Sequence, residues 1–397
     1  MRLRSQISKL FAGLLCGFAL ACQGTSGRSL PPAPPVQPDE GFSSERAWAH
    51  LEALSSFGSR ASGSEGIALA REYVQTQLEE VGLEVESIEF EIDFDSGGQP
   101  VPIVHLLSVI EGASSDEIVL VTPYDSGYYE SFAFAGANEG ASGAALLLEL
   151  ARVLKLDPLP YSVRLVFLDG EGRFGRGEPQ EVEVRYLGSS ALAQIFAERG
   201  WLSRVRLLVM LDRVGDADLR IARDLGSHRY YREEFWEAAR DLGYTEIFPR
   251  GAAYETVIGS HLAFGSLGLR RIVAISDTSF GGDEPPGIYA GTEEDTPEHC
   301  SPESLDTIGR VTLRALDVIG TRLAKIDRFA ELPVVEPDES AEPEVPEEAE
   351  GAGDAVEGAE DAAEPAAQEA AAEEIPEPPP APLDEAPDPP ELGSGSP

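Results

Sequence analysis

The sequence predicts an α/β fold, a three-layer α/β/α sandwich with a mostly parallel central sheet. Short continuous apolar runs recur along the body of the chain, and such runs are typical of strands that helices cover on both faces. Longer segments between many of these runs carry apolar residues three or four positions apart, as amphipathic helices do. Strands and helices that alternate in this way form a parallel sheet between two helical layers.

The first elements are two helices. In residues 45–57 the apolar spacing of Trp48, Leu51 and Leu54 predicts a helix that stops at Gly58. Residues 67–81 repeat this pattern, and Gly82 ends the second helix.

Strands come next. Residues 83–94 alternate between apolar and polar, whereas residues 101–110 and 118–122 are apolar runs suited to the interior of a sheet. After a loop, residues 141–154 form a strongly apolar helix. Later strands are predicted at residues 162–168, 204–211 and 269–275, and later helices at residues 189–199, 230–242 and 301–325. Ligand sites in such sheets lie where loops leave the carboxyl ends of the strands.

The N-terminus resembles an export signal. Arg2, Arg4 and Lys9 precede the apolar run 10–21, which is too short to span a membrane. The run ends in a sequence like the lipobox of bacterial lipoproteins, so residues 1–22 are predicted to be a signal peptide that ends at a lipidated Cys22. The alternative is a plain signal peptide that is cut nearby.

This signal predicts a location in the bacterial cell envelope, anchored by lipid. Gln23, in place of aspartate, favours the outer membrane, with the domain facing the periplasm or the surface. The Pro- and Ser-rich residues 23–40 are expected to form a tether. The folded domain is expected to span residues 41–327, and Cys300 is its one cysteine, so no disulfide can form within it.

The C-terminal residues 328–397 are predicted to be a disordered acidic tail. From residue 331 onward the chain contains 22 acidic residues and no Lys or Arg, so little apolar surface can be buried and the charges repel one another. The tail is either a solvated extension, which we favour, or an arm that binds cations or a basic partner. The remaining residues are still acidic, which argues against nucleic acid as a partner.

Five blocks of the body resemble the zinc exopeptidases of metallopeptidase family M28, which include aminopeptidases and glutaminyl cyclases. The blocks are residues 58–64, 136–154, 165–172, 211–221 and 291–311. The resemblance implies the zinc-exopeptidase, phosphorylase/hydrolase-like form of the sandwich. It also implies two zinc ions that share one carboxylate and activate a water molecule.

This chain fills the implied metal-ligand positions only in part. Where the family has a histidine two residues before an aspartate, Pro123 precedes Asp125, so the ligand is absent and its orienting aspartate remains. The bridging aspartate of the family is Glu139 here, and the extra methylene displaces its oxygens by about 1.5 Å. Asp212 matches a metal-binding aspartate of the family.

Two further ligand positions are glycines. The family has two adjacent glutamates, a general base and then a ligand, and this chain has Glu171 followed by Gly172. The family has a histidine before a Thr-x-x-Asp-Thr motif, and this chain has Gly291 there, with Asp295 as the aspartate of the motif. Together with Pro123, these glycines leave three of the five implied ligands without a coordinating side chain.

We therefore predict a pseudoenzyme, without zinc, that binds a peptide or protein in the former catalytic cleft. One alternative is an active aminopeptidase or glutaminyl cyclase with an altered metal site. Another is a Ca²⁺ or Mg²⁺ site, since oxygen ligands suit these ions; its ligands would be Asp125, Glu139, Glu171 and Asp212. If these carboxylates converge without a cation, the pKa of at least one of them should be raised.

Three more residues are candidates for the cleft: His261, Tyr124 and Asp295. His261 follows a block that resembles the family's Asp-Asp-His without its two acids, and it is either a substitute ligand or a locally hydrogen-bonded side chain. Tyr124 begins a group of aromatic loop residues that either hold a ligand or pack onto their own core. The other members of this group are Tyr128, Tyr129, Phe132 and Phe134.

Overall fold

A six-stranded mixed sheet organises the described part of the chain. The computed structural model describes residues 41–93, 99–174 and 186–330. The predicted signal peptide with Cys22, the tether and the acidic tail beyond residue 330 lie outside these residues. The strands are β1 (Glu86–Ile92), β2 (Val101–Ile110), β3 (Ser114–Pro123), β4 (Tyr161–Leu168), β5 (Val205–Asp212) and β8 (Ile272–Ser276).

The sheet has the order β1-β2-β4-β3-β5-β8. The β1–β2 and β2–β4 pairs are antiparallel, and the β4–β3, β3–β5 and β5–β8 pairs are parallel. The predicted mostly parallel α/β fold is therefore confirmed.

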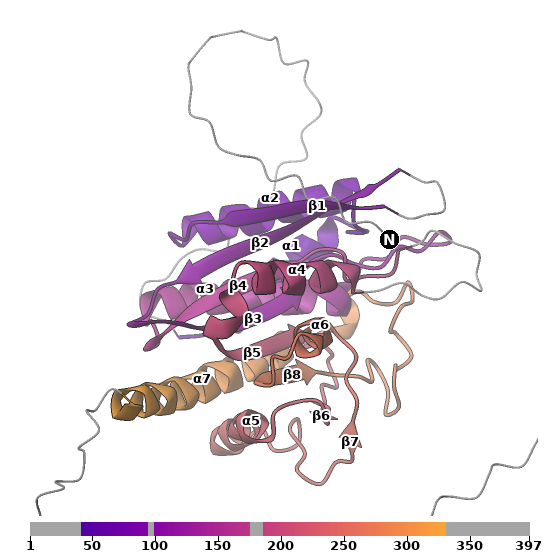
Figure 1. Cartoon of the computed structure of the whole chain (residues 1–397). Helices are drawn as coiled ribbons and strands as arrows, with labels where there is room; N and C mark the ends of the chain where they lie inside the picture. The colour runs from indigo at the N-terminus through magenta and orange to yellow at the C-terminus, as the bar shows by residue number, and fades with distance from the viewer. Residues whose placement is uncertain (1–40, 94–98, 175–185, 331–397) are drawn as a thin grey trace, which may run out of the picture. The chain divides into compact units, whose positions relative to one another are not determined.

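Helices cover both faces of this sheet and give the predicted three layers (Figure 1). The helices are α1 (Ser44–Ser56), α2 (Glu65–Glu80), α3 (Gly143–Leu156), α4 (Leu187–Glu198), α5 (Arg229–Leu242), α6 (His261–Ser266) and α7 (Pro302–Ala330). One apolar core joins a sheet face to α1, α2, α3, α5 and α7. The opposite face packs on α4 and α6, which lie in front of the sheet in Figure 1.

Strand β3 lies at a change in the direction of the chain crossovers. The chain leaves β3 through α3 to reach β4 on one side, and then returns through α4 to β5 on the other side of β3. Adjacent strands with opposite crossovers leave a crevice at their carboxyl ends. The loops after β3, β4 and β5 are therefore the part of the fold that positions a site.

Several elements differ from the sequence prediction. Strand β3 begins at Ser114, four residues before the apolar run, because a charged residue is buried there in an ion pair. The Glu117 carboxylate accepts two hydrogen bonds from the Arg164 guanidinium, at 2.6 and 2.8 Å. Helix α6 and the two-residue strands β6 (Arg223–Asp224) and β7 (Tyr254–Glu255) were not predicted, since segments this short carry no periodic pattern.

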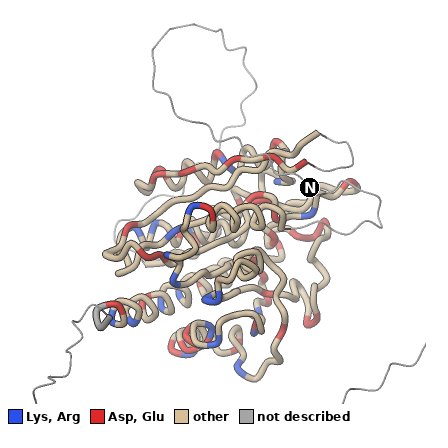
Figure 2. The backbone as a smooth tube through the Cα atoms, viewed as in Figure 1, with Lys and Arg blue, Asp and Glu red and all other residues tan. Residues whose placement is uncertain are grey.

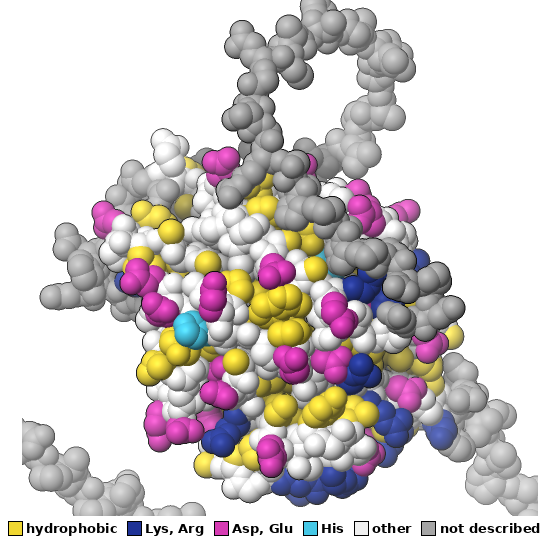
Figure 3. Space-filling view, turned by 180° about the vertical axis from the view of Figure 1, so that it is seen from behind, with side chains coloured by type: hydrophobic (Ala, Val, Ile, Leu, Met, Phe, Trp, Pro, Cys, Tyr) yellow, Lys and Arg dark blue, Asp and Glu magenta, His cyan; other side chains and the backbone are white. Residues whose placement is uncertain are grey.

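Charged residues are spread over the elements of the described part of the chain (Figure 2). Acidic residues are frequent on α2 and β1, in the upper half of Figure 2. On the face that Figure 3 shows, apolar side chains are interspersed with acidic ones, and Lys and Arg gather toward the lower edge. None of the helices within the described ranges combines the length and apolar character needed to cross a bilayer.

Candidate functional site

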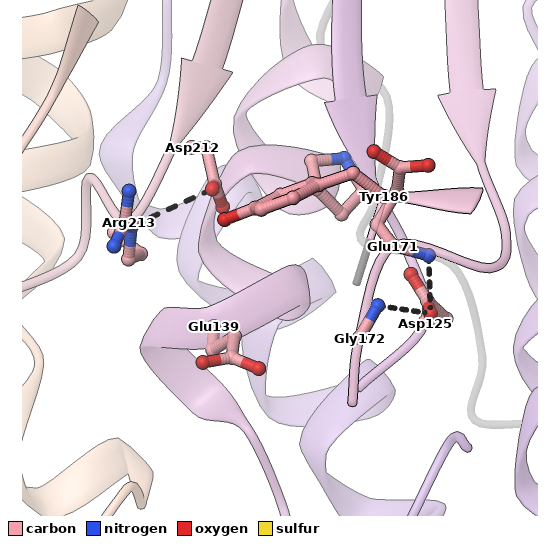
Figure 4. Close-up of a pocket in the computed structure, with 8 residues that line it drawn as sticks. Asp125, Glu139, Glu171, Gly172, Tyr186, Asp212 and Arg213 are labelled. Carbon is pink, nitrogen blue, oxygen red and sulfur yellow. Dashed lines mark hydrogen bonds and ion pairs between the residues drawn. The ribbon is translucent and has the colours of Figure 1, made fainter. Parts of the chain in front are cut away.

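A pocket of about 310 Å³ lies at the carboxyl ends of β3, β4 and β5 (Figure 4). Its lining residues are Pro123, Asp125, Glu139, Glu171, Gly172, Tyr186, Asp212 and Arg213. The structure thus brings together the four carboxylates that the sequence singled out. It also places two of the altered ligand positions, Pro123 and Gly172, in the same wall.

Asp125 follows β3 and anchors the turn after β4. Its Oδ2 atom accepts hydrogen bonds from the main-chain amides of Glu171, at 2.9 Å, and Gly172, at 2.8 Å. Its Oδ1 atom is buried and has no hydrogen-bond partner. Burial raises the pKa of Asp125 well above its ordinary value, and the charges of Asp169 and Glu171 act in the same direction.

Glu171 is held in a similar way, by one oxygen. Its Oε1 atom accepts a hydrogen bond from the amide of Ser189 at the start of α4, whereas its Oε2 atom is buried without a partner. Burial raises the pKa of Glu171 to about 8, and the charges of Asp212 and Asp169 add to this effect. The expected raised pKa in a group of converging carboxylates is confirmed by Asp125 and Glu171.

Glu139 lies on the turn η1 (Ala137–Ser142), which precedes α3. Asp295 shapes this turn, because its carboxylate accepts hydrogen bonds from the amides of Asn138, at 2.6 Å, and Glu139, at 3.2 Å. From the other side the buried Arg60 donates to carbonyl groups of the same loop, including those of Gly136 and Glu139. Asp295 therefore positions Glu139, and burial raises the pKa of Asp295 to about 7.

Asp212 ends β5 and pairs with the next residue. The Nε atom of Arg213 lies 3.5 Å from the Oδ2 atom of Asp212. The one implied metal ligand that is unchanged in this chain is thus paired with an arginine inside the pocket.

The residues present do not fit a zinc site of the family type. Among the described residues, no three or more His, Cys, Asp or Glu side chains are grouped so that they could hold a metal ion. A side chain at position 172 has no room, since a Cβ atom there would lie 2.7 Å from the carbonyl carbon and oxygen of Ser126. At Gly291 (φ +68°) a Cβ atom would lie 2.8 Å from the hydroxyl of Tyr129. The local backbone is therefore adapted to the glycine at position 172, and Tyr129 fills the space beside Gly291.

Tyr124 and His261, two further candidates for the cleft, are not among the residues that line this pocket. Tyr124 is fully buried, and its hydroxyl donates to the Val104 carbonyl at 2.7 Å, inside the fold. His261 is also buried, at the start of α6, with its Nδ1 atom 3.2 Å from the Met210 sulfur. Both side chains pack into the interior because each meets a local partner there.

Of the other aromatic residues in this loop, some pack in the core and one lines a second hollow of the surface. Phe134 is buried, and Tyr129 stacks on Phe132 with ring centroids 4.7 Å apart. Tyr128 stays partly exposed and lines a second hollow of about 740 Å³, which shares Asp125 and Gly172 with the pocket. A third hollow, of about 230 Å³, shares Glu139 and Arg213 with it and includes Asp295 in its wall.

Sequence reasoning missed Tyr186 and Arg213. Arg213 stood next to Asp212 in a block that had already been singled out, so its charge was a usable signal. Tyr186 gave no signal, because its place in the wall depends on an unusual backbone conformation (φ +60°).

Comparisons with known proteins agree with this geometry. The profile of peptidase family M28 matches residues 106–316. A glutaminyl-peptide cyclotransferase of Drosophila melanogaster is 30% identical over 164 residues, which are 40% of this chain and 45% of that protein. The aminopeptidase YwaD of Bacillus subtilis is 28% identical over 201 residues, 49% of this chain and 40% of that protein. The chain thus spans less than half the length of these two relatives.

Solved structures match a larger share of this chain than these two relatives do. A glutaminyl cyclase from an Acidobacteriales bacterium superposes with a TM-score of 0.64 at 27% identity, covering 74% of this chain and 99% of the other. A Zn-dependent exopeptidase from Parabacteroides distasonis superposes with a TM-score of 0.63 at 21% identity, covering 70% of this chain and 98% of the other. The second likeness concerns the fold alone.

Proposed function

Since the chain belongs to peptidase family M28, we propose that it is a non-catalytic member that binds the N-terminus of a peptide or protein in its pocket. The observation that carries this proposal is the pair of buried carboxylate oxygens, Oδ1 of Asp125 and Oε2 of Glu171, that have no hydrogen-bond partner. A buried acceptor without a partner is costly, and a ligand that donates to it removes that cost. Both side chains belong to the wall of one pocket.

A cationic donor suits this wall best. Among the described residues, four acidic side chains and one arginine line the pocket. Burial raises the pKa of Asp125 and Glu171, and a bound cation would stabilise their ionised forms. The ammonium group at a peptide N-terminus carries several N–H donors on one positive charge, and hydrogen bonds between ionised partners are the strong ones. The hollow that adjoins the pocket at Asp125 and Gly172 is where the residues that follow would lie.

Catalysis by a metal-activated water finds no support in the residues present. The ligand positions carry Pro123, Gly172 and Gly291, and a side chain at position 172 would clash with the backbone of Ser126. Without a metal ion, Glu171 at the general-base position has no activated water to deprotonate. We therefore assign it to binding.

A second candidate is an enzyme that cyclises N-terminal glutamine by acid–base chemistry. Glu171 favours it, because a carboxyl group with a pKa of about 8 can both accept and donate a proton near neutral pH. The similarity to glutaminyl cyclases favours it as well.

Elemental analysis of the purified chain, combined with aminopeptidase and glutaminyl cyclase assays on the same sample, separates these candidates. We expect zinc far below one ion per chain and turnover no higher than that of the Glu171→Gln variant. Stoichiometric zinc together with turnover that Glu171→Gln abolishes would overturn the non-catalytic proposal. Turnover without zinc that the same variant abolishes would establish the cyclase instead.

A further inference from the structure

Tyr186 and Arg213 both lie in the wall of the pocket, and both have an unusual backbone conformation. Their φ angles are +60° and +52°, and no other non-glycine residue in the described ranges has a positive φ. Large side chains rarely adopt this conformation, and residues that do so tend to lie at functional sites.

One carbonyl group fixes both side chains. The Ile258 carbonyl accepts a hydrogen bond from the Tyr186 hydroxyl, at 3.1 Å, and another from the Nη2 atom of Arg213, at 3.2 Å. Asp212 holds the same guanidinium from its Nε side, at 3.5 Å. Arg213 is therefore anchored at two points, and its side chain is only 23% exposed.

The pocket has its positive charge at one side, where Arg213 is paired with Asp212. In Figure 4, Arg213 lies on one side of the pocket and Asp125 on the other, and the Tyr186 side chain extends between Glu171 and Asp212. Of the described residues in this wall, Arg213 alone is cationic, and it also lines the third hollow beside Glu139. A ligand that matches both sides carries a positive group next to an acceptor oxygen.

We infer that Arg213 is a specificity-determining residue that binds the first carbonyl oxygen of a peptide whose ammonium group binds Asp125 and Glu171. This inference rests on the proposed function, since it presumes that the ammonium group occupies the pocket. The first residue of a peptide has both groups within three bonds of each other. A guanidinium is suited to hold a carbonyl oxygen, because its charge strengthens the hydrogen bond.

Two small ligands test the inference. Leucinamide carries the ammonium group and the carbonyl, and 3-methylbutylamine is the same molecule without its carboxamide. We expect the full chain to bind leucinamide about tenfold or more tighter, which is the effect of one hydrogen bond to a charged group. Calorimetric titration gives both dissociation constants.

The Arg213→Met variant tests this role, because methionine is also an unbranched side chain at this positive φ angle but carries no charge. Its preference for leucinamide should fall to about twofold or less, while 3-methylbutylamine binds as well as before or better, since a cation has left the pocket. Arg213→Lys keeps the charge and should retain part of the preference. Arg220→Met, an exposed arginine that does not line this pocket, is the matched control and should behave as the unmodified chain.

The outcomes separate the two levels of the proposal. If both ligands bind and Arg213→Met keeps the full preference, the role of Arg213 is wrong while binding of the ammonium group stands. If the unmodified chain binds the two ligands equally, the inference fails in the same way. If neither ligand binds, the proposed function fails and the inference with it. Thermal melting of each variant shows whether a loss of binding reflects a loss of fold.

Discussion

Glu171 connects the chemistry of the pocket to the stability of the chain. Its carboxyl group is buried, one oxygen is bonded to the Ser189 amide, and its pKa is raised to about 8 from 4.5. Between these two values the folded chain holds a proton on Glu171 that the unfolded chain releases. Folding is then opposed by rising pH, because the unfolded state binds fewer protons.

We expect the free energy of unfolding to fall as the pH rises from 5 to 8 and to level off above that range. Each unit of pKa difference corresponds to about 1.4 kcal/mol, so Glu171 alone contributes a decrease of up to about 4 kcal/mol. Glu171→Gln keeps the shape without the charge, and it should be more stable than the unmodified chain at pH 8.5 and less sensitive to pH. Urea unfolding at a series of pH values measures both curves.

The exposed Glu246 provides the control for this experiment. Glu246→Gln should leave the slope of stability against pH unchanged. Equal slopes for Glu171→Gln and the unmodified chain would show that Glu171 is not the buried acid described here. Asp125, Asp169 and Asp295, whose pKa values are also raised, should leave a smaller slope of the same sign in Glu171→Gln.

At the scale of the elements, the turn after β4 packs directly on the loop after β3. Asp125 accepts hydrogen bonds from the amides of Glu171 and Gly172, and a Cβ atom at position 172 would lie 2.7 Å from Ser126 and 2.8 Å from the amide of Gly127. These are backbone atoms, which cannot move aside as the end of a side chain can. The close contact between the two loops therefore leaves no room for a ligand side chain at position 172.

Gly172→Ala should lower the free energy of unfolding by about 1–3 kcal/mol, as overpacking of a tight contact does. Gly251→Ala is the matched control, since nothing lies within 4 Å of a Cβ atom there, and it should change stability by less than about 0.5 kcal/mol. Chemical denaturation of both variants gives the comparison. Equal effects of the two substitutions would show that position 172 has room for a side chain, and with it room for a restored ligand.

The elements that the sequence predicted are those with a sustained pattern. Residues 101–110 were predicted as a strand and form β2 with the same bounds, because the run is apolar and long enough to identify. Helix α6 has only six residues, and the turn η1 contains Glu139 in a non-helical conformation that no periodicity encodes. These shorter elements depend on tertiary hydrogen bonds, such as those that the amides of the turn η1 donate to Asp295.

The site shows the same contrast between residues with a pattern in the sequence and residues placed by tertiary contacts. The carboxylates could be predicted because each follows a strand or begins a helix in a block that resembles the family. Tyr186 and Arg213 could not be placed in the wall, since both side chains are held by the carbonyl of Ile258, 72 and 45 residues away in the sequence. For Tyr124 and His261 the sequence left two interpretations open, because burial of these side chains depends on partners in neighbouring elements, Val104 and Met210.

At the scale of the whole chain, charge and cavities favour one kind of ligand. The formal net charge is −41, and a charge of this sign attracts cationic ligands. At the carboxyl ends of the strands, the pocket shares Asp125 and Gly172 with the second hollow, and Glu139 and Arg213 with the third. In the proposed complex, a peptide would place its terminal ammonium group among the carboxylates of the pocket and extend into a neighbouring hollow.

The most direct test is calorimetric titration of the purified full chain, in EDTA and in zinc, with a short peptide that begins with leucine and with its N-acetylated form. We predict that the free peptide binds with the same dissociation constant in both buffers, and about tenfold or more tighter than the acetylated peptide, since acetylation removes the charge that the carboxylates bind. Binding that requires zinc, or equal binding of the two peptides, would contradict the account of a metal-free pocket for a peptide N-terminus.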